Sequence, residues 1–234
     1  NRAFDGMISG EADIATSSEA VVMFNSFKRT DFSLFCTFVT SNNDVKILTH
    51  RNSGIKTIAD LSGRKVGTIY GSSAHFFLNH TLLMNGIHEN TVEITHINPE
   101  DSLRALQNNT LDAVVTWEPF AYLSQKKLGR EVFLVKHQHH YIETFNALVL
   151  HDYAQKNPDI LKAVLKALIQ ATEFIKANKE KSQKIVARTL KKDLNIIMGT
   201  WDYFNFRVNL NQWLLTSLES EARWAIDRGF VEKK

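Results

Sequence analysis

Residues 10–19 read GEADIATSSE, and residues 109–118 read NTLDAVVTWE. In both stretches an Asp closes a turn, a short apolar run predicts a strand, and a polar end opens a helix-like segment. Asp13 and Asp112 lie 112 − 13 = 99 positions apart, and Glu19 and Glu118 keep the same offset. In open α/β sheets, ligands bind beyond the carboxyl ends of the strands. The repeat therefore predicts two similar α/β lobes with a ligand between them.

The composition is that of an ordinary globular protein. The chain has 234 residues, enough for one domain or two small ones, with 44% hydrophobic and 23% charged residues. Its net charge of +3 comes from 28 basic and 25 acidic residues spread along the chain, so we expect no nucleic-acid partner. A single cysteine, Cys36, excludes an internal disulfide and a cysteine-based zinc site. No apolar run approaches the roughly 18 residues that a membrane span requires.

Strand-like and helix-like segments alternate in the middle of the chain. We expect strands at 46–49, 65–70, 92–97, 112–116 and 131–135, and helices at 74–84, 99–108 and 119–127. Such alternation predicts parallel pairing with both sheet faces covered. After Asn157 the pattern is nearly all helical. We place one lobe at 47–140 and build the other from the flanking pieces 1–46 and 141–234.

The three prolines mark expected helix starts. Pro99, Pro119 and Pro158 each follow a plausible cap and are expected at the first helical position. The helix from Pro158 has one apolar stripe, formed by Leu161, Val164, Leu165, Leu168, Thr172 and Ile175. The later aromatic residues are expected to pack within helices: Trp201, Tyr203, Phe204, Phe206, Trp213 and Trp224.

The best local candidate for a ligand contact is Gly71-Ser72-Ser73, between an expected strand and an expected helix. Free N–H groups and the positive end of the helix dipole favour an anion at such a junction. Glycine allows close approach of the backbone, and the serine hydroxyls can donate hydrogen bonds. The alternative is that Ser72 or Ser73 only caps the helix, and the two roles are compatible. The segment lacks the pattern of a P-loop or of a dinucleotide fingerprint.

The ends of the two repeated stretches are the next candidates. Trp117 can form a flat wall of a binding cleft, and Glu118 can accept hydrogen bonds there. Alternatively, Trp117 lies in a core and Glu118 complements a helix dipole. The equivalent segment Ser17-Ser18-Glu19 carries the same two interpretations. The repeated aspartates are expected to be turn residues rather than catalytic ones.

Other chemistry is not indicated. His137, His139 and His140 lack a His-Glu-x-x-His pattern and thiolate partners, so we expect a solvated strand end there rather than a metal site. Cys36 lies in the apolar run 35–39, which favours a buried inert thiol over a nucleophile. No Gly-x-Ser-x-Gly elbow occurs. We therefore expect no catalytic residue, no metal and no cofactor.

The order of motifs resembles a known family. The chain reads ILTHR at 47–51, IADLSGRKVG at 58–67, GSSA at 71–74, NPED at 98–101, LDA at 111–113 and WEPF at 117–120. This order is similar to that of the nitrate/sulfonate/taurine group of ABC-transporter substrate-binding proteins. The group includes binders of the thiamine pyrimidine precursor, and the pyrimidine-precursor synthases are related to it. GEAD at 10–13 and NALV at 146–149 extend the resemblance over most of the chain.

The resemblance implies a type II periplasmic-binding-protein fold, in which two lobes close on a ligand by a hinge motion. It places Thr40, Phe145 and Asn146 near the crossovers, and it makes the Gly71 and Trp117 segments contacts from one lobe and the Ser17 segment contacts from the other. It further implies a monomeric periplasmic or extracytoplasmic protein. Such a protein captures a small polar or anionic ligand, such as a sulfonate, taurine, nitrate or a pyrimidine precursor, for an ABC permease. The resemblance implies no enzymatic activity.

One departure from the family pattern concerns the start. Family members have a strand, a helix and a second strand before the Gly-Glu-x-Asp phrase, and here the chain starts at Asn1 without a signal peptide. Either an upstream segment is missing from this sequence, which is the interpretation we favour, or the first lobe is incomplete and exposes a sheet edge.

Two further interpretations remain open. The ending at 208–226 resembles the tail of binding domains fused to signalling modules, which indicates a ligand-sensing domain of a membrane receptor. The less favoured one is an enzyme like the pyrimidine-precursor synthases, which carry a cysteine-rich motif that this chain lacks.

Overall fold

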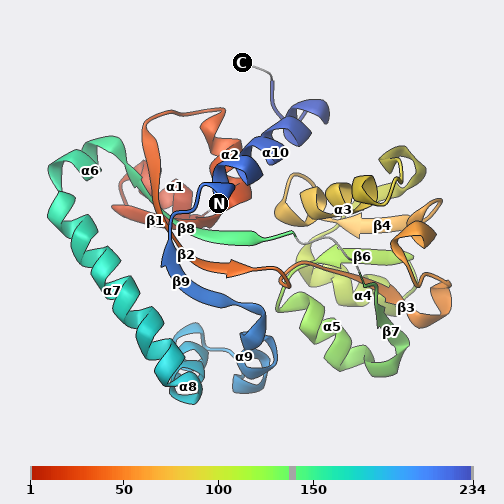
Figure 1. Cartoon of the computed structure of the whole chain (residues 1–234). Helices are drawn as coiled ribbons and strands as arrows, with labels where there is room; N and C mark the ends of the chain where they lie inside the picture. Colours follow the sequence, from red (N-terminus) through yellow and green to blue (C-terminus); the bar gives the residue numbers. More distant parts are fainter. Residues whose placement is uncertain (1, 137–140, 233–234) are drawn as a thin grey trace. The chain divides into compact units, whose positions relative to one another are not determined.

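The computed structural model describes residues 2–136 and 141–232, which divide into two compact units. Unit 1 comprises 2–41, 143–191 and 204–232, and unit 2 comprises 42–136, 141–142 and 192–203. Each unit has its own sheet and helices (Figure 1). No helix in these ranges combines the length and apolar character needed to cross a bilayer.

The sheet of unit 1 has four antiparallel strands in the order β1-β8-β2-β9. Their bounds are β1 Ile14–Ser18, β2 Phe32–Ser41, β8 Glu143–Leu150 and β9 Asn205–Asn209. Strand β8 lies between β1 and β2, although about a hundred residues separate β8 from β2 in the sequence (Figure 1). Residues 143–150 therefore align with both early strands at once.

The helices of unit 1 are α1 Arg2–Ser9, α2 Glu19–Ser26, α6 His151–Lys156, α7 Pro158–Ala177, α8 Lys179–Leu190 and α10 Trp213–Asp227. Phe4 and Met7 of α1 pack with Ala15, Val22 and Leu148 in one core. The expected stripe of α7 is confirmed, because all six of its residues are half-buried while their neighbours are exposed. α7 packs along β9, and α10 packs against α2.

The sheet of unit 2 has five strands in the order β5-β4-β6-β3-β7. Their bounds are β3 Lys46–His50, β4 Lys65–Thr68, β5 Glu93–His96, β6 Ala113–Thr116 and β7 Val132–Leu134. The expected parallel pairing is confirmed for β4 with β5 and β6. It is wrong for β3, which runs antiparallel to β6 and β7. The rule applies to neighbours joined by a crossover helix, and both neighbours of β3 come much later in the chain.

The helices of unit 2 are α3 Ser73–Met84, α4 Ser102–Gln107, α5 Phe120–Leu128 and α9 Leu194–Thr200. Short 3-10 turns join these elements: η1 Arg51–Ser53, η2 Ile58–Leu61, η3 Glu89–Thr91, η4 Pro99–Asp101, η5 Gly129–Glu131 and η6 Trp201–Tyr203. Buried apolar residues of β3, α4, β6 and α5 form one core, with Leu48, Leu106, Val114 and Ala121 among them.

The repeated helix–strand–helix order is confirmed, since α1-β1-α2 occurs in unit 1 and α4-β6-α5 in unit 2. The turn role of the second Asp is visible too. The side chain of Asp112 accepts a hydrogen bond from the backbone N–H of Lys65 at 2.8 Å, which fixes the start of β6 beside β4.

Two local expectations are wrong. Pro119 was expected at the first helical position of α5, but it is the N-cap, and the first helical residue is Phe120. The aromatic residues before 210 do not lie in a regular α-helix: Trp201 and Tyr203 lie in η6, and Phe206 lies in β9 opposite Val39. Pairing with β2 decides this conformation, and a partner strand so far away in the chain leaves no local signal.

Candidate functional site

The loop between β4 and α3 contains the first predicted contacts. Gly71 has a left-handed backbone with φ of 64°, a conformation that glycine adopts without a steric penalty. The Ser72 hydroxyl donates to the carbonyl oxygen of Ile69 at 2.6 Å and accepts from the N–H of His75 at 3.4 Å. Ser72 is thus the N-cap of α3, as one of the two interpretations had it, and its contact with a ligand stays a prediction.

Ser73 begins the helix that follows this cap. Ser73 is 5% exposed and Ala74 is fully buried. Within a helix, the first N–H groups have no carbonyl partner one turn earlier. The start of α3 therefore combines backbone donors with the positive end of a helix dipole, which is an arrangement that favours an anion.

The segment after β6 starts at the same end of the sheet as this loop, where strands β4 and β6 have their carboxyl ends. Strands β4 and β6 are parallel neighbours, so their carboxyl ends lie side by side. Trp117 is half-buried, and Glu118 is buried. One Glu118 oxygen, Oε2, accepts from the N–H of Tyr122 at 2.8 Å, which places a carboxylate at the start of α5. The interpretation of Glu118 as a partner of the helix dipole is confirmed, and its contact with a ligand stays a prediction.

The other Glu118 oxygen makes an ion pair that the sequence analysis missed. Lys46 Nζ lies 2.8 Å from Glu118 Oε1, and the two side chains are 3% and 2% exposed. The same Nζ donates to the carbonyl oxygen of Asn43 and lies 3.8 Å from the centre of the Tyr203 ring. Burial and, after it, the charge of Glu118 raise the pKa of Tyr203. The sequence signal for this ion pair was the position of Lys46 as the first residue of an otherwise apolar strand, where a lysine is expected to need a partner.

In unit 1, the predicted residues Ser17, Ser18 and Glu19 join β1 to α2. Ser18 is the N-cap of α2 without a side-chain capping bond. Glu19 is fully buried, and its Oε2 accepts from the N–H and the hydroxyl of Thr144 at 2.6 and 2.9 Å. Its carboxylate therefore ties α2 to β8.

Glu19 also lies beside a second buried acid, Glu221 of α10. Glu221 is fully buried, and burial raises its pKa well above the ordinary 4.5, with the charge of Glu19 raising it further. A protonated Glu221 can share its proton with Glu19, which joins α10 to α2.

The sheet of unit 1 brings together predicted residues that are distant in sequence. β8 pairs Asn146 with Ser17 and Phe145 with Ser18 on one side, while Thr40 lies opposite Thr144 on the other. Asn146 is fully buried; its Oδ1 accepts from Thr37 at 2.6 Å and its Nδ2 donates to Thr144 at 2.8 Å. The Phe145 ring contacts that of Phe204, with ring centres 6.2 Å apart.

Two buried hydroxyls occupy equivalent positions of the repeat. Ser17 and Thr116 are 116 − 17 = 99 positions apart, and they lie at the carboxyl ends of β1 and β6. Among the described residues, neither hydroxyl oxygen has a hydrogen-bond partner, although Ser17 is 7% and Thr116 0% exposed. Buried hydroxyls are normally bonded, so these two oxygens are exceptions. The repeat could have shown Thr116, which the sequence analysis did not select.

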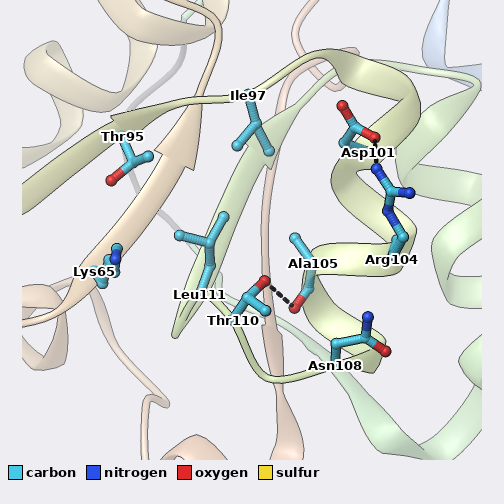
Figure 2. Close-up of a pocket in the computed structure, with 9 residues that line it drawn as sticks. All are labelled: Lys65, Thr95, Ile97, Asp101, Arg104, Ala105, Asn108, Thr110 and Leu111. Atoms are coloured by element: carbon cyan, nitrogen blue, oxygen red, sulfur yellow. Dashed lines mark hydrogen bonds and ion pairs between the residues drawn. The ribbon is translucent and has the colours of Figure 1, made fainter.

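A groove of about 370 Å³ lies elsewhere in unit 2, beside β4, β5 and α4. Figure 2 shows its apolar side chains, Ile97 and Leu111, and the ion pair of Asp101 with Arg104 at 2.6 Å. None of the predicted contacts lines this groove. Its charged residues at 101 and 104 pair with each other, so we do not assign the ligand site to it.

Metal and thiol chemistry find no support in the described ranges. Within residues 2–136 and 141–232, no group of three histidine, cysteine or carboxylate side chains could hold a metal ion. The three histidines at 137, 139 and 140 lie outside the described residues. Cys36 is 2% exposed, and burial raises the pKa of its thiol to about 11, which keeps it protonated near neutral pH.

Comparison with solved structures identifies the fold. The periplasmic aliphatic sulphonate binding protein SsuA from Escherichia coli has a TM-score of 0.88 at 23% identity, covering 100% of this chain and 80% of that chain. The desulfurization enzyme DSZB has a TM-score of 0.71 at 14% identity, covering 94% and 80%. At such identities the likeness shows the fold alone, and this chain has the periplasmic-binding-protein fold. The expected α/β fold class is confirmed.

Sequence comparison gives the family. The model of the NMT1/THI5-like family matches residues 2–182, so the chain belongs to that family. A putative aliphatic sulfonates-binding protein of Escherichia coli strain K12 is 31% identical over 158 residues, covering 67% of this chain and 49% of that relative. The chain thus spans about half the length of the curated relatives it matches. The family inferred from the motifs is confirmed.

Proposed function

We propose that this chain is the ligand-binding part of an extracytoplasmic solute-binding protein that delivers a small organic anion to an ABC permease. The proposed ligand class is that of alkanesulfonates and taurine. The similarity to a putative aliphatic sulfonates-binding protein supports this class. We further propose that the protein acts as a monomer and is not an enzyme. The buried, protonated thiol of Cys36 is unsuited to act as a nucleophile.

The observation that carries the proposal is the pair of unpartnered hydroxyls at equivalent strand ends, Ser17 and Thr116. A sulfonate group has three oxygen acceptors and no donor, so it matches hydroxyl and backbone N–H donors. We propose Thr116, Gly71, Ser72 and Ser73 as donors from unit 2. The remaining proposed contacts are Trp117, Glu118, Ser18, Glu19, Thr40, Phe145 and Asn146.

A thermal-shift screen tests the ligand class. The panel holds ethanesulfonate, taurine, aromatic sulfonates, nitrate, bicarbonate and thiamine-pyrimidine compounds. A ligand at about 100 times its dissociation constant stabilises the folded protein by about 2.7 kcal/mol, which gives a visible shift in Tm. Stabilisation by the sulfonates alone is the expected result. A well-folded sample that responds to no member of the panel contradicts the proposal.

Thr116→Val then tests the site itself. Valine keeps the shape and removes one buried hydroxyl that has no partner in the ligand-free protein. We expect unchanged or higher stability and an affinity for ethanesulfonate that is lower by about 0.5–1.5 kcal/mol. Ser17→Ala and Ser73→Ala are expected to weaken binding by a similar amount. Thr81→Val is the matched control, because Thr81 also has a buried unpartnered hydroxyl but lies inside α3. Equal affinity of Thr116→Val and wild type in titration calorimetry removes Thr116 from the site.

A further inference from the structure

His75 is a buried residue of α3 whose side chain folds back onto the loop before the helix. It is 4% exposed. Its ring nitrogen Nδ1 lies 3.3 Å from the backbone nitrogen of Gly71, whose N–H points at it. Only an unprotonated Nδ1 can accept that hydrogen bond, so the geometry requires the neutral ring with its proton on Nε2.

The ring is fixed from two further sides. Nε2 lies 3.7 Å from Oε1 of Glu89 in η3, and both side chains are nearly buried. The Tyr70 ring stacks on the imidazole, with centres 5.3 Å apart and planes inclined by 25°. Tyr70 is itself anchored, because its hydroxyl donates to the carbonyl oxygen of Ile94 at 2.7 Å and its N–H donates to Nδ1 of His96 at 3.1 Å.

These contacts make His75 the acceptor that holds Gly71 in place. Gly71 has a positive φ of 64°, and the next two residues are the cap and the first residue of α3. Its N–H has no role in the helix itself, so the imidazole decides how the peptide between Tyr70 and Gly71 is oriented. A change at this peptide moves the donors that follow it.

We propose that His75 is a positioning residue of the ligand loop, and that its protonation weakens anion binding. The inference rests on the proposed function, because it assigns the loop at 71–73 to the ligand. Neutral His75 holds Gly71 so that the N–H groups after it face the anion. Protonation puts a hydrogen on Nδ1, so that two donors, this N–H and the Gly71 N–H, face each other. The hydrogen bond is then lost, and Gly71 is no longer held in this orientation.

The charge gained on protonation does not offset this loss. α3 packs against η2, η3 and β6. The titratable groups of these elements are Glu89 in η3 and Asp60 in η2, while β6 has none. Glu89 faces Nε2 and balances a charged imidazole, whereas the Asp60 carboxylate accepts from the N–H groups of Lys56 and Thr57. Protonation thus adds one positive charge on the Nε2 side of the ring, beside Glu89, whereas the lost acceptor on Nδ1 acts directly on the Gly71 N–H. Histidine changes charge in the mildly acidic range, where the effect is measurable.

Two neutral variants separate positioning from packing. His75→Asn keeps an acceptor oxygen near the place of Nδ1 and does not titrate, whereas His75→Gln places its amide nearer the position of Nε2. The probe is ethanesulfonate, measured by titration calorimetry at about pH 8 and about pH 5.5. We expect the wild-type affinity to fall about three- to tenfold at the lower pH, the range for one lost hydrogen bond. His75→Asn should bind equally at both pH values, and His75→Gln should bind weakly at both.

The inference is overturned if the affinity of His75→Asn for ethanesulfonate depends on pH as that of wild type does. It is also overturned if His75→Gln binds ethanesulfonate with wild-type affinity. The ligand-free protein provides a second readout by NMR. The Gly71 amide proton should be protected from exchange at about pH 8 and lose protection as the His75 ring titrates. Protection of the Gly71 amide that is the same at both pH values also overturns the inference. Absence of ethanesulfonate binding at both pH values contradicts the proposed function instead, and the Gly71 amide then decides the role of His75 alone.

Discussion

Replacing Glu118 by Gln should destabilise the protein strongly, because it leaves a buried lysine without its counter-charge. Lys46 Nζ and Glu118 Oε1 are 2.8 Å apart, and both side chains are almost completely buried. Glutamine keeps the size of the side chain and can still accept from the Tyr122 N–H. The substitution therefore removes the charge that faces the ammonium group. Because the single amide oxygen then serves the Tyr122 N–H, it also turns the amide NH2 donor toward Lys46.

The magnitude follows from the environment of the ammonium group. Removing one partner of a buried ion pair typically costs about 3–5 kcal/mol. Lys46 keeps the carbonyl oxygen of Asn43 and the Tyr203 ring at 3.8 Å, and a desolvated cation–π contact is worth about 2 kcal/mol. We therefore expect a loss of stability of about 3 kcal/mol, at the lower end of this range. The double variant Lys46→Met with Glu118→Gln should recover most of it, because a buried pair replaced by neutral groups is often close to neutral in stability.

Urea unfolding followed by circular dichroism measures these differences. Glu93→Gln is the matched control, since its ion pair with Lys65 joins two strands of unit 2 at 3.6 Å with side chains 69% and 45% exposed. This control should lie within about 0.5 kcal/mol of wild type. A Glu118→Gln protein as stable as the control refutes the reasoning, as does a double variant no more stable than Glu118→Gln.

Three other substitutions or reactions test the structure. Because the pKa of Glu221 is raised in the folded state, the folded protein holds a proton that the unfolded chain releases above its ordinary 4.5, so stability falls as pH rises beyond that value. Glu221→Gln keeps a donor toward Glu19. It should be more stable than wild type at pH 7.5, by at most about 4 kcal/mol, and only slightly more stable at pH 5. An equal gain in stability at both pH values in urea unfolding would contradict this. Gly199→Ala should lower the stability by about 1–3 kcal/mol, because its Cβ would overlap the Tyr122 ring. A Tm at or above that of wild type would count against the close packing of α9 on α5. The Cys36 thiol, with its pKa raised to about 11, should not react with a thiol reagent at pH 8 until urea unfolds the protein, and prompt reaction of the folded protein would be incompatible with its burial.

Local patterns determined the parts of the fold that depend on neighbours in sequence. The repeat around Asp13 and Asp112 predicted both helix–strand–helix segments, since turn residues and apolar runs act within a few positions. The Asp60 carboxylate at the start of η2 accepts from the N–H of Thr57 three residues earlier, a capping contact that also depends only on neighbours in sequence. The capped loop at 71–73 was also predicted from sequence, because a glycine and a serine cap between a strand and a helix form a local signal.

Tertiary structure alone decided which distant groups meet. No pattern at 192–203 assigned this segment to unit 2, where Gly199 allows close approach to Tyr122. The partner of Glu118 is a lysine at the start of another strand, and the acceptor for the Gly71 N–H is a ring one helical turn away. Hydrogen bonds and ion pairs depend on position and on exclusion of water, and burial is a property of the whole fold. The sequence thus specified the strand ends and loops of the candidate site, while packing determined which of their side chains are paired and which hydroxyls have no hydrogen-bond partner.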